Sequence, residues 1–356
     1  MTRSFLVAFA LLLFGCPPTL SRPRSPEHLN ALAEGERHAR HGRHDEAIAA
    51  FAHAAETADR RVDRDEARYR QSRALVDAGR YDEAVALLDE IAAARPPSRR
   101  TGRALYDAAL LRFERLDAIP QALEGFERVV REHPDDGLGG RALHHWFGWM
   151  REHRGVDAVL ATIAQLDAVL SESTLGDDLL WRRHELQLAA DRRAEAVATL
   201  ELLVERHPYP QGERWDDAIL LLATMDLEDG HPEAAVARLE AMLERAETTT
   251  LMGSYTLPAF PEARLRIARI HRDAGDHASA RRSYEALVDD FPDSTLRDDA
   301  LYELASMQLD AGDRDGCDTL ERVLEITDVG RSARAARERL ERDCTSLGSA
   351  APTSGE

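Results

Sequence analysis

The chain has few aromatic residues and no useful length of alternating apolar and polar residues. Aromatics make up 6% of its 356 residues, and there are 21 glycines and 15 prolines. Half-buried strands alternate apolar and polar side chains and favour aromatic and β-branched residues. The composition therefore argues against a β-rich domain.

Lysine is absent, and arginine is outnumbered by acidic residues. The 46 basic residues are all arginine, against 65 Asp and Glu, and the formal net charge is −19. Nucleic acids and anionic membrane surfaces are bound by clustered cations that neutralise phosphates. The charge therefore indicates that nucleic acid is not a partner.

Motifs of catalytic and phosphate-binding sites are also missing. The sequence holds no Gly-rich phosphate loop, no Gly-x-Ser-x-Gly and no Cys-x-x-Cys. Acidic pairs such as Asp177-Asp178 and Asp216-Asp217 fall near predicted helix starts, where carboxylates interact favourably with the helix dipole. We therefore predict a protein that is not an enzyme, with no cofactor and no small-molecule substrate.

Histidines offer the only metal-like spacing. His38, His41 and His44 are separated by three residues each, and such spacing can place imidazoles on one helix face. Gly42 is expected to end the helix between His41 and His44. Packing is therefore the preferred interpretation of these residues, and no metal site is predicted.

What the chain does have is a recurring triplet: alanine, an apolar residue four positions later, and another three positions after that. Most copies are about 36–39 residues apart, with one longer gap near residue 250, and such a period marks a helical repeat array. The copies are Ala47-Phe51-Ala54, Ala84-Leu88-Ile91, Ala122-Phe126-Val129, Ala196-Leu200-Leu203, Ala235-Leu239-Met242 and Ala280-Tyr284-Leu287.

One unit, residues 65–97, shows the physical basis of the pattern. Apolar residues at helical spacing predict a first helix, and Gly79 directly follows its last periodic residue. The small Ala84 then lets a second helix approach the first closely, and Pro96 ends that helix. The unit is predicted to be a helix hairpin.

The Ala–Phe–Ala–Pro spacing with a preceding Gly-x-Tyr resembles the tetratricopeptide repeat over roughly residues 28–325. The resemblance implies an all-α fold, a right-handed superhelical solenoid of TPR-like helix hairpins, with a C-terminal capping helix at about 331–344. Two copies are degenerate. Near Ala158 the frame is expected to shift to Ile163 and Leu166, and the last copy reads Gly316-Leu320-Val323.

The N-terminus predicts an exported, lipid-anchored protein. Residues 5–14 form an apolar run too short to span a membrane, and it ends in Leu13-Phe14-Gly15-Cys16. That ending resembles the bacterial lipobox, which implies that residues 1–15 are a lipoprotein signal peptide and that Cys16 is lipidated. The alternative is an ordinary signal peptide with an incidental cysteine.

The remaining boundaries follow from composition. Residues 16–27 are Pro-rich and are predicted to be an extended tether after the lipidated cysteine. Residues 28–345 would form the TPR-like solenoid of about eight hairpins, with an uncharged insert at 248–261 that either packs on the array or docks a partner. Residues 346–356 are small and polar and are predicted to be a disordered tail.

Cys317 and Cys344 remain as an even pair in a compartment expected to be oxidising. Antiparallel packing of the last repeat helix and the capping helix would bring the two together. We therefore predict a disulfide; the alternative is two buried free thiols.

Large aromatics gather in and after the middle of the chain and are candidates for binding a partner. The partner-binding candidates are Trp149, Trp181, Trp215, Tyr255 and Phe260, while register favours a core position for Trp146. Tryptophan and tyrosine are frequent anchors of interfaces, but the same residues could be core residues between helices. An acidic chain would favour a partner with basic residues.

The stretch Phe291-Pro292-Asp293-Ser294, followed by residues 299–305, is similar to repeats of periplasmic assembly proteins of Gram-negative envelopes. These include the lipoprotein subunit of the β-barrel assembly machinery and the Tol–Pal-associated TPR protein. The resemblance implies a non-catalytic scaffold for protein or peptide partners in the cell envelope, lipid-anchored at the outer membrane and facing the periplasm. The alternatives are a helical accessory array of a cell-wall enzyme and a component of a secretion or surface apparatus.

The anchor is directly testable through Cys16→Ser. If Cys16 carries the lipid, this variant moves from the membrane fraction to the soluble fraction or accumulates unprocessed, because acyl chains hold such proteins at a membrane. Fractionation and intact mass measure the outcome. Normal mass together with full membrane retention would contradict lipidation.

Overall fold

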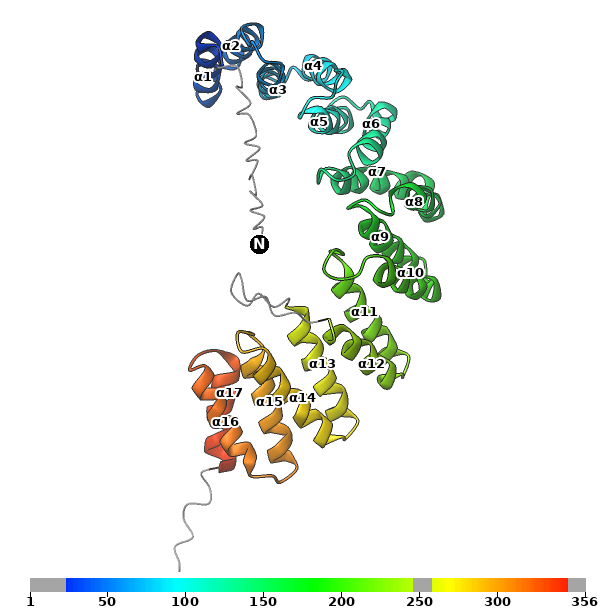
Figure 1. Ribbon diagram of the computed structural model, residues 1–356, viewed down its shortest axis with the longest axis vertical. Coiled ribbons are helices and arrows are strands. Elements are labelled where there is room, and N and C mark those ends of the chain that lie inside the picture. The colour runs from blue at the N-terminus through cyan, green and yellow to red at the C-terminus, as the bar shows by residue number, and fades with distance from the viewer. Residues whose placement is uncertain (1–23, 246–257, 345–356) are drawn as a thin grey trace, which may run out of the picture. The chain divides into compact units, whose positions relative to one another are not determined.

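The computed structural model describes residues 24–245 and 258–344, and every regular element in them is a helix (Figure 1). The predicted all-α fold is therefore confirmed. The chain divides into two compact units, residues 1–153 and 154–356. Neither described part holds a helix long and apolar enough to cross a membrane.

Unit 1 holds the helices α1 to α7. Their bounds are α1 Pro26–Arg40, α2 His44–Glu56, α3 Arg61–Asp77, α4 Tyr81–Ala93, α5 Thr101–Glu114, α6 Ile119–Glu132 and α7 Gly139–Arg154. Within this unit α1 packs on α2, α3 on α4, and α5 on α6, and each hairpin also packs on the next.

Unit 2 holds the remaining helices. Their bounds are α8 Val156–Leu170, α9 Gly176–Ala189, α10 Arg193–Arg206, α11 Trp215–Glu228, α12 Pro232–Leu243, α13 Ala259–Asp273, α14 His277–Asp290, α15 Arg297–Asp310, α16 Asp315–Ile326, α17 Gly330–Arg339 and the π-helical turn η1 Leu340–Cys344. Hairpins form from α9 to α16 in consecutive pairs, and α17 packs on α15 and α16.

The recurring alanine lies in the core of its hairpin. All six triplet alanines are completely buried: Ala47, Ala84, Ala122, Ala196, Ala235 and Ala280. In the last hairpin Gly316 takes this place, where a Cβ would lie 2.6 Å from Cγ of Leu309 and 2.9 Å from the carbonyl oxygen of Ala305. A small residue is therefore required there.

The shifted frame near residue 158 is also confirmed. Val159, Ile163 and Leu166 are completely buried on α8, whereas Thr162 is only half-buried. These three residues form the buried face of α8, and Val159 occupies the position that is alanine in most other repeats.

Glycine at the turn between paired helices serves its expected purpose at Gly79. Its φ of 74° lies in the left-handed region, and the amide of Arg80 donates to the carbonyl of Leu75. This is the six-to-one hydrogen bond of a Schellman ending. Asp117 and Asp191 adopt the same backbone region at the turns before α6 and α10.

Several predicted boundaries need correction. Helix α1 begins at Pro26, with Ser25 accepting a hydrogen bond from the amide of His28, so residues 26–27 do not belong to the tether. Helix α13 begins at Ala259, so residues 259–261 of the insert are helical. The signal peptide, Cys16, Tyr255 and the tail at 346–356 lie outside the described residues.

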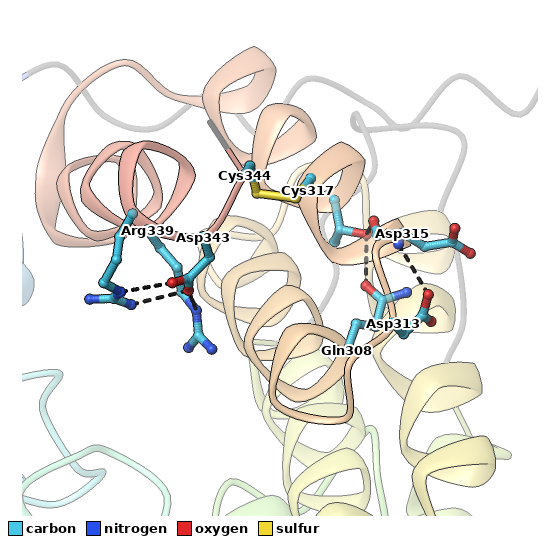
Figure 2. The surroundings of a disulfide bond; sticks show 9 residues. Gln308, Asp313, Asp315, Cys317, Arg339, Asp343 and Cys344 are labelled. Carbon is cyan, nitrogen blue, oxygen red and sulfur yellow. Dashed lines mark hydrogen bonds and ion pairs between the residues drawn. A yellow bond between two sulfur atoms is a disulfide. The ribbon is translucent and has the colours of Figure 1, made fainter. Parts of the chain in front are cut away.

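The end of unit 2 is closed by a covalent bond. Cys317 at the start of α16 and Cys344 at the end of η1 form a disulfide, with their Cα atoms 5.9 Å apart (Figure 2). The pair encloses a loop with a separation of 27 residues. A disulfide that closes a loop of this size stabilises a fold by about 3–4 kcal/mol in the chain-entropy model.

Two glycines in unit 1 allow a matched test of helix packing. A Cβ at Gly125 of α6 would lie 2.8 Å from the Cβ of Ala109, whereas a Cβ at Gly148 of α7 would meet nothing within 4 Å. Gly125→Ala should therefore destabilise the protein by about 1–3 kcal/mol through overpacking. Gly148→Ala should stabilise it by about 0.5–1 kcal/mol, since alanine loses less backbone entropy than glycine. Urea unfolding of both variants measures the difference, and shifts of equal sign would contradict the close helix contact.

Candidate protein-interaction surface

Two of the predicted partner-binding aromatics are core residues. Trp215 is 3% exposed and Phe260 is fully buried. The ring of Tyr209 lies 5.8 Å from that of Trp215 and 5.7 Å from that of Phe260, between centroids. Both residues occupy inward-facing positions in the first turns of α11 and α13, so the prediction that they contact a partner is wrong.

Trp181 of α9 is half-buried, and an arginine side chain already lies over its ring. It packs against the core cluster of α9, α10 and α11, while the guanidinium of Arg214 lies 5.4 Å from its ring centroid. Its indole nitrogen donates to Glu185 at 3.1 Å. Trp149 is also half-buried, and its ring stacks on His153 with centroids 4.3 Å apart. Roles for Trp149 and Trp181 in binding stay predictions.

A cavity of about 780 Å³, which we name the acidic pocket, opens in unit 2. It lies between the first turns of α11 and α13 and the turn that joins α14 to α15. Leu220, Pro261 and Phe291 contribute apolar surface to it. Six acidic residues line it: Asp216, Asp217, Glu262, Asp289, Asp290 and Asp293.

Internal arginines neutralise only part of this charge. Glu262 pairs with Arg266 at 2.8 Å, and Asp217 lies 3.4 Å from Arg214. Asp290 pairs more loosely with Arg264 at 3.6 Å. The pocket is thus lined by more carboxylates than the described arginines compensate.

Asp216 and Asp289 have no ion pair among the described residues. Asp289 is exposed at the end of α14. Asp216 is half-buried, and burial raises the pKa of its carboxyl group. Asp217 adds to this pKa shift, whereas backbone amide hydrogen bonds and the charge of Arg214 oppose it. A partly desolvated carboxylate that forms no ion pair is stabilised when an external cation approaches it.

The acidic charge of the chain belongs almost wholly to unit 2. Residues 1–153 hold 23 arginines and 24 acids, whereas residues 154–356 hold 23 arginines and 41 acids. The resulting formal charges are −1 and −18. A field of this size attracts cationic partners to unit 2 over long range at low ionic strength.

Helices α13 and α15, each the first helix of its hairpin, are joined by a half-buried charge network. Glu303 of α15 accepts hydrogen bonds from Arg269 at 2.6 Å, from Arg272 at 2.9 Å and from the Tyr284 hydroxyl at 3.0 Å. Burial alone would raise the pKa of Glu303, but the hydrogen bond and charge of Arg269, the Tyr284 hydroxyl and Arg272 outweigh it and lower the pKa.

Two smaller cavities, of about 560 and 460 Å³, flank this network. Arg266 and Arg269 line the first, and Arg272 and Glu303 line the second. Arg266 is paired with Glu262, and Arg269 and Arg272 are paired with Glu303. The flanking cavities therefore offer less uncompensated charge than the acidic pocket does.

Sequence reasoning noticed the pair Asp216-Asp217 but interpreted it only as a helix start. The segment 289–293 was interpreted only as part of a repeat, although it places three acids within five residues around Phe291 and Pro292. That density of charge beside apolar residues was the available signal. Which acids share a pocket depends on how α11, α13 and the α14–α15 turn pack.

Helix hairpins that pack on their neighbours and leave open cavities between them define the class of helical repeat proteins, whose extended surfaces hold other molecules. The chain belongs to the tetratricopeptide repeat family, whose model matches residues 32–99, 69–137, 220–295 and 265–315, more than half of the chain. Proteins of this family are generally non-catalytic scaffolds for protein–protein interaction. No curated protein matches the chain.

Several solved structures are similar. YrrB, a TPR protein with an unusual peptide-binding site, is 15% identical over 61% of this chain and 99% of its own, with a TM-score of 0.36. The C-terminal part of a TPR protein from Cytophaga hutchinsonii is 11% identical over 76% and 99%, with a TM-score of 0.41. The TPR2AB domain of yeast Sti1, solved with pHSP90, is 14% identical over 87% and 98%, with a TM-score of 0.30.

The Glu303 network predicts a pH-dependent contribution to stability. Because the pKa of Glu303 is lower in the folded protein, its contribution is present above the unfolded value of 4.5 and is lost as the pH falls through the folded value. Glu303→Gln should lower the free energy of unfolding by about 1–3 kcal/mol at neutral pH. The difference from the unsubstituted protein should shrink in acid.

Glu285→Gln is the control, since Glu285 forms a surface pair with Arg281 at 3.0 Å. Such pairs contribute about 0–1 kcal/mol. Urea unfolding across a pH series compares the variants, and a Glu303→Gln effect that stays constant down to strong acid would contradict the assigned cause.

Proposed function

We propose that this protein is a non-catalytic scaffold that captures a basic segment of a partner protein in its acidic pocket. We further propose that Cys16 anchors it by lipid in the cell envelope, most simply at the outer membrane facing the periplasm. The work of such a scaffold would be envelope assembly, as in the lipoprotein subunit of the β-barrel assembly machinery or the Tol–Pal-associated TPR protein.

The observation that carries the proposal is the half-buried Asp216, which lines the acidic pocket without an ion-pair partner among the described residues. An arginine or lysine brought to this carboxylate would offset its desolvation. Arginine suits such sites because its planar guanidinium binds carboxylates through two parallel hydrogen bonds.

The dimensions of the pocket support a peptide segment as the ligand. Its volume of about 780 Å³ lies within the range of roughly 300–1,000 Å³ that holds a ligand of several side chains. Leu220 and Phe291 can cover the apolar stem of an arginine or a neighbouring aliphatic side chain, while Asp289 meets the charge. The preferred segment is therefore basic and partly apolar.

A labelled peptide of alternating arginine and leucine tests this function. It should bind the described protein in a salt-sensitive way, since exposed charge pairs are screened. Asp216→Asn combined with Asp289→Asn should weaken binding by about ten-fold, the effect of roughly 1.4 kcal/mol. Fluorescence anisotropy at two salt concentrations measures both effects.

Glu240→Gln is the matched control because Glu240 is exposed on α12, outside the pocket. It removes one charge from unit 2 and should change binding little. A glutamate–leucine peptide of equal length should not bind. Equal binding of both peptides, or an equal effect of Glu240→Gln, would refute recognition by the acidic pocket.

A further inference from the structure

The first hairpin carries a cluster of positive charge, residues 37–44, which we name the basic turn. It contains Arg37, Arg40 and Arg43 with three histidines and no acidic residue. All three arginine side chains are exposed, and none forms an ion pair within the described parts of the chain. The turn projects at the end of α1, where Gly42 has a φ of 67° and open space around it.

Several other hairpins carry an acidic residue where the first hairpin has an arginine. Two residues before the turn glycine, the first hairpin has Arg40. Other hairpins have an acid there: Asp77, Glu228, Asp273 and Asp310. Directly after the glycine, α14 and α16 are preceded by Asp276 and Asp313, whereas the first hairpin has Arg43. At the position of Arg40 the charge of the first hairpin is therefore opposite to that of these four hairpins.

Internal repeats reveal what a residue at the position of Arg43 normally contacts. Arg80 holds the same position in the next hairpin and bonds to Asp45, 35 residues earlier, at 3.4 Å. Arg192 likewise bonds to Asp157, also 35 residues earlier, at 2.5 Å. In both cases the partner is a carboxylate on the preceding second helix. No described helix precedes α1. Arg43 could therefore form the same kind of contact, but no carboxylate from a preceding helix is there to receive it.

We propose that the basic turn of one copy docks in the acidic pocket of a second copy of this chain. The inference rests on the proposed function, because it names one occupant of the same pocket. Charge complementarity supports it on both sides, because Arg37, Arg40 and Arg43 of the nearly neutral unit 1, and Asp216 and Asp289 of unit 2, form no ion pair with any described residue. The turn is exposed with open space around Gly42, whereas its proposed receptor is a cavity of about 780 Å³.

The contact joins two different surfaces, so it is heterologous. After the first contact, one copy still has a free acidic pocket and the other still has a free basic turn. Association of this type continues until the copies close a ring or form an open chain. Mass should therefore rise beyond a dimer as the protein concentration increases.

Charge reversal tests whether the basic turn docks in the acidic pocket. The experiment uses the full chain without lipid. Sedimentation velocity at low salt should show self-association that high salt weakens. Arg40→Glu with Arg43→Glu should weaken it by about ten-fold or more, and Asp289→Arg with Asp290→Arg should do the same. Mixing the two reversed proteins should restore association, because an acidic turn then meets a basic pocket.

Arg99→Glu and Glu240→Arg are matched controls, since both residues are exposed and lie outside the two surfaces. They should leave self-association nearly unchanged, and circular dichroism confirms that each variant is folded. A monomeric unsubstituted protein at low salt, or reversed variants that are not restored by mixing, would overturn the inference.

The outcomes for the two proposals are separable. If the arginine–leucine peptide binds the pocket but the protein stays monomeric, the pocket serves a different partner and self-docking is wrong. If copies associate through these charges but the peptide fails to bind, the proposed capture of basic partner segments is wrong while the self-contact stands.

Discussion

The architecture depends on how closely the two helices of a hairpin can approach. A fully buried alanine marks the contact in six hairpins, and Gly316 marks it in the last, where any Cβ would meet Leu309 and the backbone of Ala305. Interiors are packed so densely that even one added methyl group has to displace its neighbours. This close contact sets the distance between the helices, and the cavities that open beside α11, α13 and α15 arise between hairpins built this way.

The repeat fold could be predicted because its determinants are local. The alanine triplets, the turn glycine at Gly79 and the shifted frame at Ile163 and Leu166 each specify packing within about one repeat, and such arrays are stabilised chiefly by neighbouring contacts. The register of Gly316 followed from the same rule. Helix ends were less predictable, since the start of α1 at Pro26 depends on a cap from Ser25 and that of α13 lies beside a Pro-rich stretch.

The candidate site was harder to predict, because it depends on the direction of side chains. Trp215 and Phe260 are large aromatics in the expected part of the chain, yet a shift of one or two residues along a helix decides whether such a ring faces a groove or the core. The acidic pocket joins Asp216 with Asp289, which are far apart in sequence. Their proximity follows only from the packing of α11 and α13 with the turn after α14. The excess of acidic residues led to the expectation of a basic partner, which stays a prediction.

The disulfide gives the two ends of the array unequal freedom. In a chain of repeats, loss of order usually starts at an end, where a unit has only one neighbour. Cys317 and Cys344 hold the last helices together covalently, so fraying at that end cannot separate α16 from η1. Local unfolding is therefore expected to begin at the repeats nearest α1, where helix contacts are replaced by water most readily.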